Sequence, residues 1–112
     1  MRDNVKGGAL TEVTFFILLA LYEPKHGYGI MQFVEKETGG RLNLGAGSLY
    51  GAINSLQEKR WISPVNDSDS DGTVRKKEYM ITEAGKKVAE SELIRLKQLI
   101  ITASNIMKGE EK

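Results

Sequence analysis

The sequence predicts a mainly α-helical fold with a small β-hairpin, and three observations lead to this class. Four stretches have the apolar spacing, or the all-round apolar character, of helices. Two stretches, residues 61–65 and 74–82, have the β-prone residues of strands. The length of 112 residues, with 40% hydrophobic and 28% charged residues, fits one globular unit.

The composition also excludes several classes of protein. The chain has no cysteine and one histidine, which excludes disulfide scaffolds and thiolate metal sites and argues against histidine-based catalytic triads. The longest apolar run, residues 15–22, is too short to cross a membrane, and the first residues lack the pattern of a secretory signal. We therefore expect a cytoplasmic protein that needs no metal or cofactor and does not associate with a membrane.

End signals and spacing place the first three helices. The residues before Leu10 are polar and glycine-containing, and we expect them to be mobile. Thr11 is a typical N-cap, and the apolar helix that follows ends before Pro24, because a proline moves the preceding residue out of the α region. Further helices are predicted over residues 27–38 and 46–60.

The third helix has an unusual distribution of side chains. Leu49, Ile53 and Leu56 form one apolar stripe, and the other faces carry small, uncharged residues as far as residue 56. A solvated helix face usually carries lysine and glutamate, so this composition indicates that something packs closely on the helix. The partner is either another helix or the groove of a nucleic acid.

Two strands follow the third helix, and the segment NDSDSDGT at residues 66–73 reads as an acidic turn between them. Two strands joined by a turn form a β-hairpin. Three helices followed by a hairpin is the order of elements in a winged helix-turn-helix, so we assign residues 1–82 to a DNA-binding unit of this kind.

The last helix is predicted to begin after Thr82 and to form a dimerisation helix within residues 83–112. Six apolar residues repeat at intervals of four and three, which is the seam of a coiled coil. The rest of the chain is too small to cover this seam, so we expect a two-fold homodimer. The expected interface combines this seam with two residues of the first helix: Phe15, Leu19, Ala89, Leu93, Leu96, Ile100, Ala103 and Met107.

Four short motifs resemble the PadR family of bacterial transcriptional regulators, in its short-tailed branch. The motifs are HGYGI at residues 26–30, SLY at 48–50, RKK at 75–77 with Tyr79 after it, and ITEAG at 81–85. Each motif alone is weak, but their order and spacing together are specific. The resemblance covers the chain from about Leu10 to Met107.

The resemblance implies a winged-helix dimer that represses transcription from a palindromic operator in double-stranded DNA. The third helix would enter the major groove, and the hairpin would reach the flanking backbone or minor groove. Some members release DNA when they bind a phenolic compound or a flat aromatic drug, so a small-molecule effector belongs to the expectation. Two departures are Gly51, where members often have proline, and a last helix without aromatic residues, which argues against a stacking-type drug pocket.

Candidate DNA contacts come from the third helix, the second strand and a lysine before the second helix. Asn54 has the amide that pairs with adenine, and the Tyr50 hydroxyl either donates to a phosphate or its ring closes the core. The basic residues of the second strand neutralise phosphates, or they only keep an edge strand soluble. The predicted contacts are Lys25, Ser48, Tyr50, Asn54, Ser55, Arg75, Lys76 and Lys77.

Trp61 either packs beneath the hairpin or borders a cavity at the dimer centre, which Phe16 would also line. Two interpretations of Phe16 and Trp61 therefore stay open: they line a ligand cavity, or they take part in ordinary packing.

Two functions compete at this point. The first is a DNA-binding transcriptional regulator, and the second is a winged-helix module that binds a protein and not DNA. The net charge of +1 fits the second, whereas the basic residues before Tyr79 favour the first. An enzyme is not expected, because the sequence has no paired nucleophile and base, phosphate loop or metal cluster.

Overall fold

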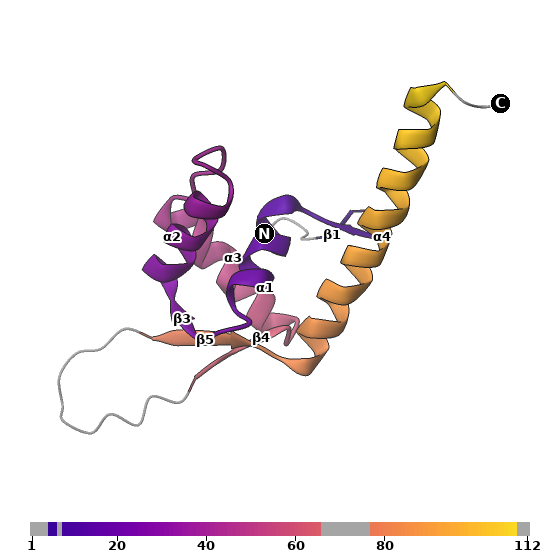
Figure 1. Cartoon of the computed structure of the whole chain (residues 1–112). Helices are drawn as coiled ribbons and strands as arrows, with labels where there is room; N and C mark the ends of the chain where they lie inside the picture. Colours follow the sequence, from indigo (N-terminus) through magenta and orange to yellow (C-terminus); the bar gives the residue numbers. More distant parts are fainter. Residues whose placement is uncertain (1–4, 7, 66–76, 110–112) are drawn as a thin grey trace, which may run out of the picture.

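The computed structural model describes residues 5–6, 8–65 and 77–109. Three helices and a small sheet form a body, and a long final helix runs away from it (Figure 1). The helices are α1 (Glu12–Ala20), α2 (Gly27–Glu37), α3 (Ala46–Glu58) and α4 (Glu83–Lys108). The strands are β1 (Val5–Lys6), β2 (Ala9–Leu10), β3 (Lys25–His26), β4 (Ile62–Pro64) and β5 (Glu78–Ile81).

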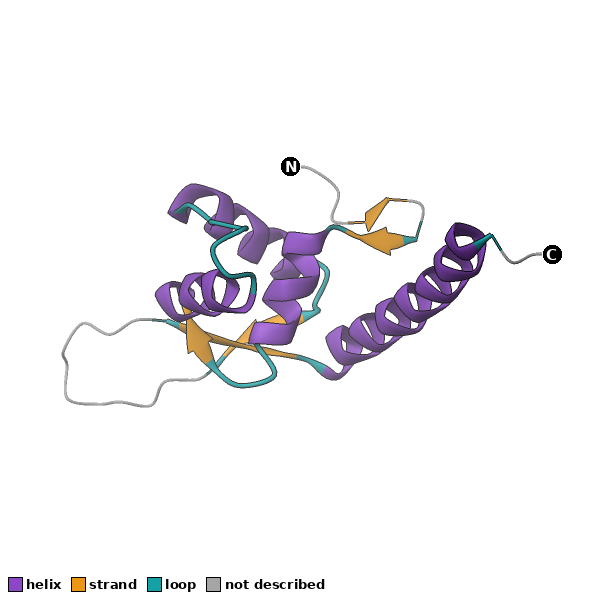
Figure 2. Cartoon of the chain, turned by 45° about the horizontal axis from the view of Figure 1, so that its top comes forward, coloured by secondary structure: helices purple, strands orange, loops and turns teal. Residues whose placement is uncertain are grey.

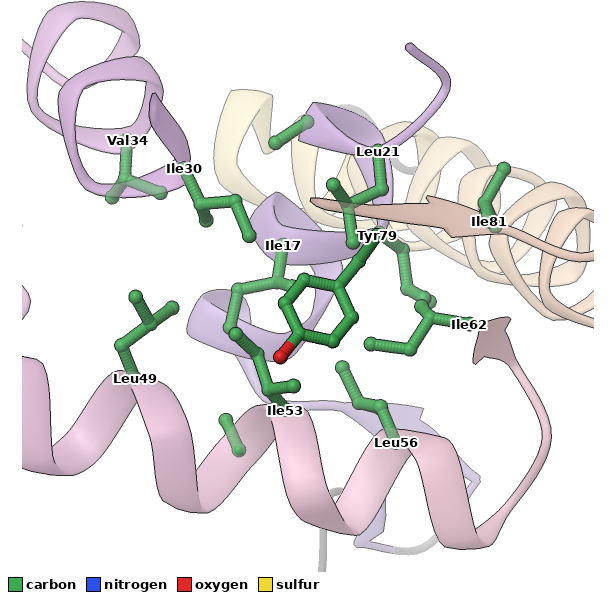
Figure 3. Close-up of a cluster of buried hydrophobic side chains, with 13 residues drawn as sticks. Ile17, Leu21, Ile30, Val34, Leu49, Ile53, Leu56, Ile62, Tyr79 and Ile81 are labelled. Carbon is green, nitrogen blue, oxygen red and sulfur yellow. The ribbon is translucent and has the colours of Figure 1, made fainter. Parts of the chain in front are cut away.

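The core of the body lies between α1, α2, α3 and the sheet (Figure 3). The apolar stripe of α3 is buried there, opposite Ile17 and Leu21 of the α1 region. Ile30 and Val34 close the core from α2, and Tyr79 and Ile81 close it from β5. Each fully buried side chain of this size contributes about 1.5–3 kcal/mol, so these contacts fix the position of α3 relative to the sheet.

The sheet has three strands in the order β3-β5-β4, and both pairs are antiparallel. Strands β4 and β5 form the predicted hairpin, with Ile62 opposite Ile81. Strand β3 extends it, because Lys25 pairs with Tyr79 and His26 with Glu78. Strand β3 was not predicted from the sequence, because two residues give no periodicity.

The described part of the segment before α1 forms two short strands that were not predicted from the sequence, and its mobility stays a prediction. Val5–Lys6 and Ala9–Leu10 pair as an antiparallel ribbon beside α4 (Figure 2). The Leu10 N–H donates to Glu92 Oε1 of α4 at 3.4 Å. This long-range contact connects the ribbon to α4, and the local sequence did not indicate it.

The start of α4 is tied closely to the end of α3. The Thr82 hydroxyl accepts from the Gly85 N–H at 3.0 Å and donates to the Arg60 carbonyl at 2.8 Å. A Cβ at residue 85 would overlap the Trp61 carbonyl oxygen, so only glycine fits there. The ITEAG motif is therefore the joint between the body and α4.

The end of α3 adopts a Schellman motif with an arginine in the left-handed position. Arg60 has φ 66°, and the Trp61 N–H donates to the Leu56 carbonyl at 3.0 Å. Glycine is the usual residue at such a position, because a Cβ disfavours the left-handed conformation.

Candidate nucleic-acid interface

One face of α3 is open to solvent and uncharged. Gly47, Tyr50, Gly51 and Asn54 follow the spacing of a single helix face. Asn54 and Tyr50 are exposed, and a Cβ at Gly47 or Gly51 would meet nothing within 4 Å. No other part of the described chain packs on these glycines, so the small residues do not serve a helix contact within the protomer. The face combines two glycines with the side chains of Tyr50 and Asn54, and the Asn54 amide lies at its C-terminal end.

The two serines of the predicted set lie away from this face. Ser48 is exposed but is rotated toward the side of α3 that Ser55 occupies. Ser55 is only 8% exposed and belongs to the buried side of the helix. The prediction that Ser55 contacts DNA is corrected, because the buried stripe is wider than the three apolar residues that defined it.

Tyr50 extends from α3 to the start of α2. Its side chain is 45% exposed, so it does not close the core. A Cβ at Gly27 would overlap the Tyr50 hydroxyl, which shows how closely the ring lies against the first turn of α2. Gly27 of the HGYGI motif therefore leaves space for the ring of Tyr50 in the SLY motif.

A small hollow lies where α2, α3 and β5 meet. Its volume is about 170 Å³, and its lining residues are His26, Gly27, Tyr28, Tyr50, Lys77 and Tyr79. Lys77 is exposed at the rim, whereas Tyr79 is 6% exposed and its ring extends from β5 toward α3 (Figure 3). Burial raises the pKa of the Tyr79 hydroxyl, and the nearby Tyr50 raises it further.

The four predicted basic contacts have different outcomes. Lys77 is exposed beside the hollow. Arg75 and Lys76 lie outside the described residues. Lys25 is used within the protomer, because its Nζ donates to the Ala20 carbonyl at 2.7 Å and lies 5.2 Å from the centre of the Phe33 ring. The Lys25 ammonium therefore stabilises the C-terminal end of α1, and its contact with DNA stays a prediction.

Tyr28 and Tyr79 line this hollow and were not predicted as site residues from the sequence. His26 also lines the hollow. The imidazole does make a local bond, since Nδ1 accepts from the Gly29 N–H at 3.3 Å as the N-cap of α2. The available signal was that three of the four tyrosines fall within or beside the motifs, but only the pairing of β3 with β5 brings them together.

A second hollow, of about 320 Å³, lies between the N-terminal ribbon and α4. Trp61 lines it together with Gly8, Leu10, Lys87, Val88, Ser91 and Glu92. Phe16 is not among the lining residues and packs against the core instead, so the structure does not unite the predicted pair. The indole ring of Trp61 also receives Lys59, whose Nζ lies 5.6 Å from the ring centre.

Glu92 is the charged side chain buried most deeply in the described part of the chain, at 4% exposed. Arg95 Nε donates to its Oε1 at 2.9 Å, and Leu10 contributes a backbone N–H. The Arg95 hydrogen bond is the main reason that the pKa of Glu92 lies below its usual range, although burial acts in the opposite direction.

Most of the predicted dimer seam on α4 is uncovered. Leu93, Ile100 and Met107 are exposed, whereas Leu96 and Ala103 are half-buried. Ala89 is only 3% exposed because it packs within its own protomer, so it is removed from the predicted interface. On α1, Leu19 is exposed at 36% and Phe15 is half-buried. Further apolar side chains flank the seam: Ile94, Leu99, Ile101 and Ile106.

The described residues offer neither a metal site nor a membrane-spanning helix. They contain no group of three or more histidine, cysteine, aspartate or glutamate side chains that could hold a metal ion. Within the same ranges, no helix has the length and apolar character needed to cross a membrane.

Solved structures share this fold. A PadR family transcriptional regulator from Eggerthella lenta has a TM-score of 0.71 at 19% identity, covering 88% of this chain and 83% of that chain. A PadR family regulator from Clostridium difficile has a TM-score of 0.69 at 21% identity, covering 88% and 100%. Bacillus subtilis PadR in complex with operator DNA has a TM-score of 0.65 at 22% identity, covering 75% and 48%. These likenesses confirm the predicted winged helix-turn-helix fold class.

Comparisons of sequence give the family. A protein of a Streptomyces fradiae transposon, described as uncharacterized, is 34% identical over 82 residues; the match covers 72% of this chain and 22% of that protein's length. Residues 17–91 match the transcriptional regulator PadR-like family, which agrees with the prediction that the chain is not an enzyme. The chain therefore belongs to the PadR-like family of transcriptional regulators.

Proposed function

We propose that the protein is a cytoplasmic, dimeric, sequence-specific DNA-binding regulator that represses a nearby operon from a palindromic operator. The third helix α3 reads bases in the major groove, and the hairpin of β4 and β5 contacts the flanking backbone. A small-molecule effector releases the DNA. Family membership supports the regulatory role, and the operator complex of Bacillus subtilis PadR supports this mode of binding by analogy of fold.

The open face of α3 is the observation that carries the proposal. A helix reads bases from a major groove only where its own surface is narrow enough to insert and polar enough to bond. Gly47 and Gly51 leave the backbone accessible, and Asn54 presents a donor and an acceptor on the same face, one turn after Gly51. No acidic side chain precedes Glu58 on this helix, so the inserted part carries no charge that phosphates would repel.

Homodimerisation is proposed from the exposed seam of α4. A helix this apolar and this exposed would be unfavourable in an isolated protomer. A second copy covers the seam by two-fold symmetry and sets two copies of α3 against the two half-sites of a palindrome.

The first experiment measures binding of the full chain to a duplex of its own upstream region by fluorescence anisotropy. We expect binding in the nanomolar range that random DNA does not displace. Asn54→Ala should weaken operator binding about 5- to 100-fold, because a bidentate base contact is lost. Asn105→Ala removes the same side chain from the exposed polar side of α4 and should leave affinity unchanged.

The charge on the hairpin is tested in the same assay. Lys77→Glu should weaken binding to operator and random duplexes alike, because phosphate contacts carry little sequence information. Lys36→Glu makes the same charge change on the exposed side of α2 and serves as the control. Equal, weak binding of all variants to all duplexes would favour the protein-interaction module, and a pull-down from lysate would then identify its partner.

A further inference from the structure

The hollow between α2, α3 and β5 contains the hydroxyl of a buried tyrosine that has no hydrogen-bond partner among the described residues. Tyr79 is 6% exposed and lines the hollow. Within the part of the chain that the structure describes, no donor or acceptor engages its hydroxyl; its electrostatic neighbour is the hydroxyl of Tyr50. Such groups are rare in native proteins, because an unsatisfied buried hydroxyl costs about 1–3 kcal/mol. The hydroxyl is therefore free to donate to a molecule that enters the hollow.

The start of α2 supplies further donors at the same place. The first N–H groups of a helix have no acceptor within the helix, and the helix dipole favours an anion beside them. The imidazole of His26 accepts the N–H of Gly29, which leaves those of Gly27 and Tyr28 without an intrahelical acceptor. Because Gly27 has no Cβ, the Tyr50 hydroxyl lies directly against this turn.

The charged side chain among the described residues that line the hollow is a cation. Lys77 stands at the rim, two residues before Tyr79 and on the same side of the chain by the alternation of a strand. The residue between them, Glu78, does not line the hollow. None of the lining residues carries a carboxylate. A volume of about 170 Å³ is below the range of drug-sized pockets. The hollow therefore suits a small anion with several acceptor atoms.

We propose that this hollow is a socket for one phosphate group, held by the hydroxyls of Tyr50 and Tyr79, the ammonium of Lys77 and the first amides of α2. The proposal rests on the proposed function where the phosphate comes from the DNA backbone beside α3. A free phosphate-bearing ligand has the same chemistry and would occupy the same atoms. In both cases the phosphate accepts a hydrogen bond from the Tyr79 hydroxyl.

The socket is tested first without DNA. The full chain, labelled with ¹⁵N, is titrated with inorganic phosphate at constant pH and constant ionic strength, with chloride as the replaced ion. We expect saturable shifts of the amide signals of Gly27 and Tyr28. Tyr79→Phe should weaken phosphate binding about tenfold, because a hydrogen bond to a charged group is lost. Tyr22→Phe removes a hydroxyl outside the hollow and should bind phosphate as the wild type does.

Thermal unfolding separates this role from a structural one. Tyr79→Phe should be as stable as the wild type, or more stable, in phosphate-free buffer, because no protein hydrogen bond is broken. Lys77→Ala is an exposed substitution that keeps the test available should Tyr79→Phe fail to fold. Amides that do not move in the wild type, or equal phosphate affinity in wild type, Tyr79→Phe and Lys77→Ala, would overturn the socket.

The source of the phosphate is tested on a random-sequence duplex. If the socket holds the DNA backbone, Lys77→Ala should lower the salt dependence of binding by about one phosphate contact relative to the control Lys36→Ala. An unchanged salt dependence together with intact phosphate binding assigns the socket to a free phosphate-bearing ligand. Phosphate binding without any duplex binding would keep the socket and reject the proposed DNA-binding function. Normal duplex binding without amide shifts would do the reverse.

Discussion

A single buried carboxylate connects the N-terminal ribbon to α4. Glu92 accepts from Arg95 and from the backbone of Leu10, and these bonds favour its ionised form. Its pKa in the folded state is below the unfolded value, so it stabilises the fold above the unfolded pKa. This contribution is lost as the pH falls through the folded pKa.

Glu92→Gln should therefore lower the free energy of unfolding at pH 7 by about 1–2 kcal/mol, since a charge-assisted pair is lost. The difference from the wild type should shrink in acid, where the wild-type carboxyl is protonated as well. Urea unfolding followed by circular dichroism between pH 7 and pH 3 measures both effects. Glu90→Gln, on the exposed side of the same helix, should show no comparable difference; an equal loss in both variants would contradict the assignment.

The left-handed backbone of Arg60 gives a prediction of opposite sign. Glycine adopts φ 66° without the Cβ penalty, so Arg60→Gly should raise the free energy of unfolding by about 0.5–1 kcal/mol. Lys59→Gly, one residue earlier in the right-handed conformation, should instead be destabilising. Thermal unfolding of the two variants gives the comparison, and a stability loss in both would show that the Arg60 side chain makes a compensating contact.

The sequence did not determine the exposure and the contacts of several single residues. The types of residue at the α3 surface were predictable, because glycine, serine and asparagine stand out against the usual charged helix face. Which of them are exposed was not: Ser55 and Asn54 are neighbours in sequence, yet the first is buried and the second is exposed. Lys25 had a plausible anion site beside it, but its reach to the Ala20 carbonyl depends on a turn that no local pattern encodes.

In α3, one substitution is expected to raise the stability of the protein and to weaken its binding to the operator. Gly51 lies inside the helix with open space around it, so Gly51→Ala should raise the free energy of unfolding by about 0.5–1 kcal/mol. The same methyl group stands on the face proposed to enter the groove and should weaken operator binding. Denaturation and anisotropy on one variant measure the two effects.

Gly45→Ala, at the N-cap of α3, is the matched control, because a Cβ there also meets nothing within 4 Å. It should leave operator affinity near that of the wild type. A Gly51→Ala variant that gains stability and keeps full operator affinity would show that DNA does not approach α3 closely.

The four helices were predictable to within a few residues, because α2, α3 and α4 have periodic apolar positions and α1 is a continuous apolar stretch that follows an N-cap. Thr11 and Thr82 are N-caps in the structure as predicted. The short strands β1, β2 and β3 were not predictable, since two-residue strands are defined by their partners and not by their own sequence. The hollow at Tyr79 depends on β3, and for that reason the sequence did not reveal it.

At the scale of the whole molecule, the exposed seam of α4 predicts the state of assembly. Ile100→Glu should convert the proposed dimer into a monomer, because a charge would be buried at the centre of the contact. Operator affinity should fall by about a hundredfold or more, since two linked half-sites bind more tightly than one. Sedimentation and anisotropy measure these two quantities.

Thr102→Glu places the same charge on the exposed polar side of α4 and should remain dimeric. A monomeric wild type, or an Ile100→Glu variant that still sediments as a dimer, would contradict an interface through this seam.

The contact between Gly85 and the Trp61 carbonyl determines an angle as well as a distance. The 26 residues of α4 extend about 39 Å from this point, so a tilt of about 5° at its base displaces its far end by about 3 Å. In the proposed dimer such a displacement changes the separation of the two reading helices. Gly85 would then govern the number of base pairs between the halves of the operator, whereas the residues of α3 govern which bases those halves contain.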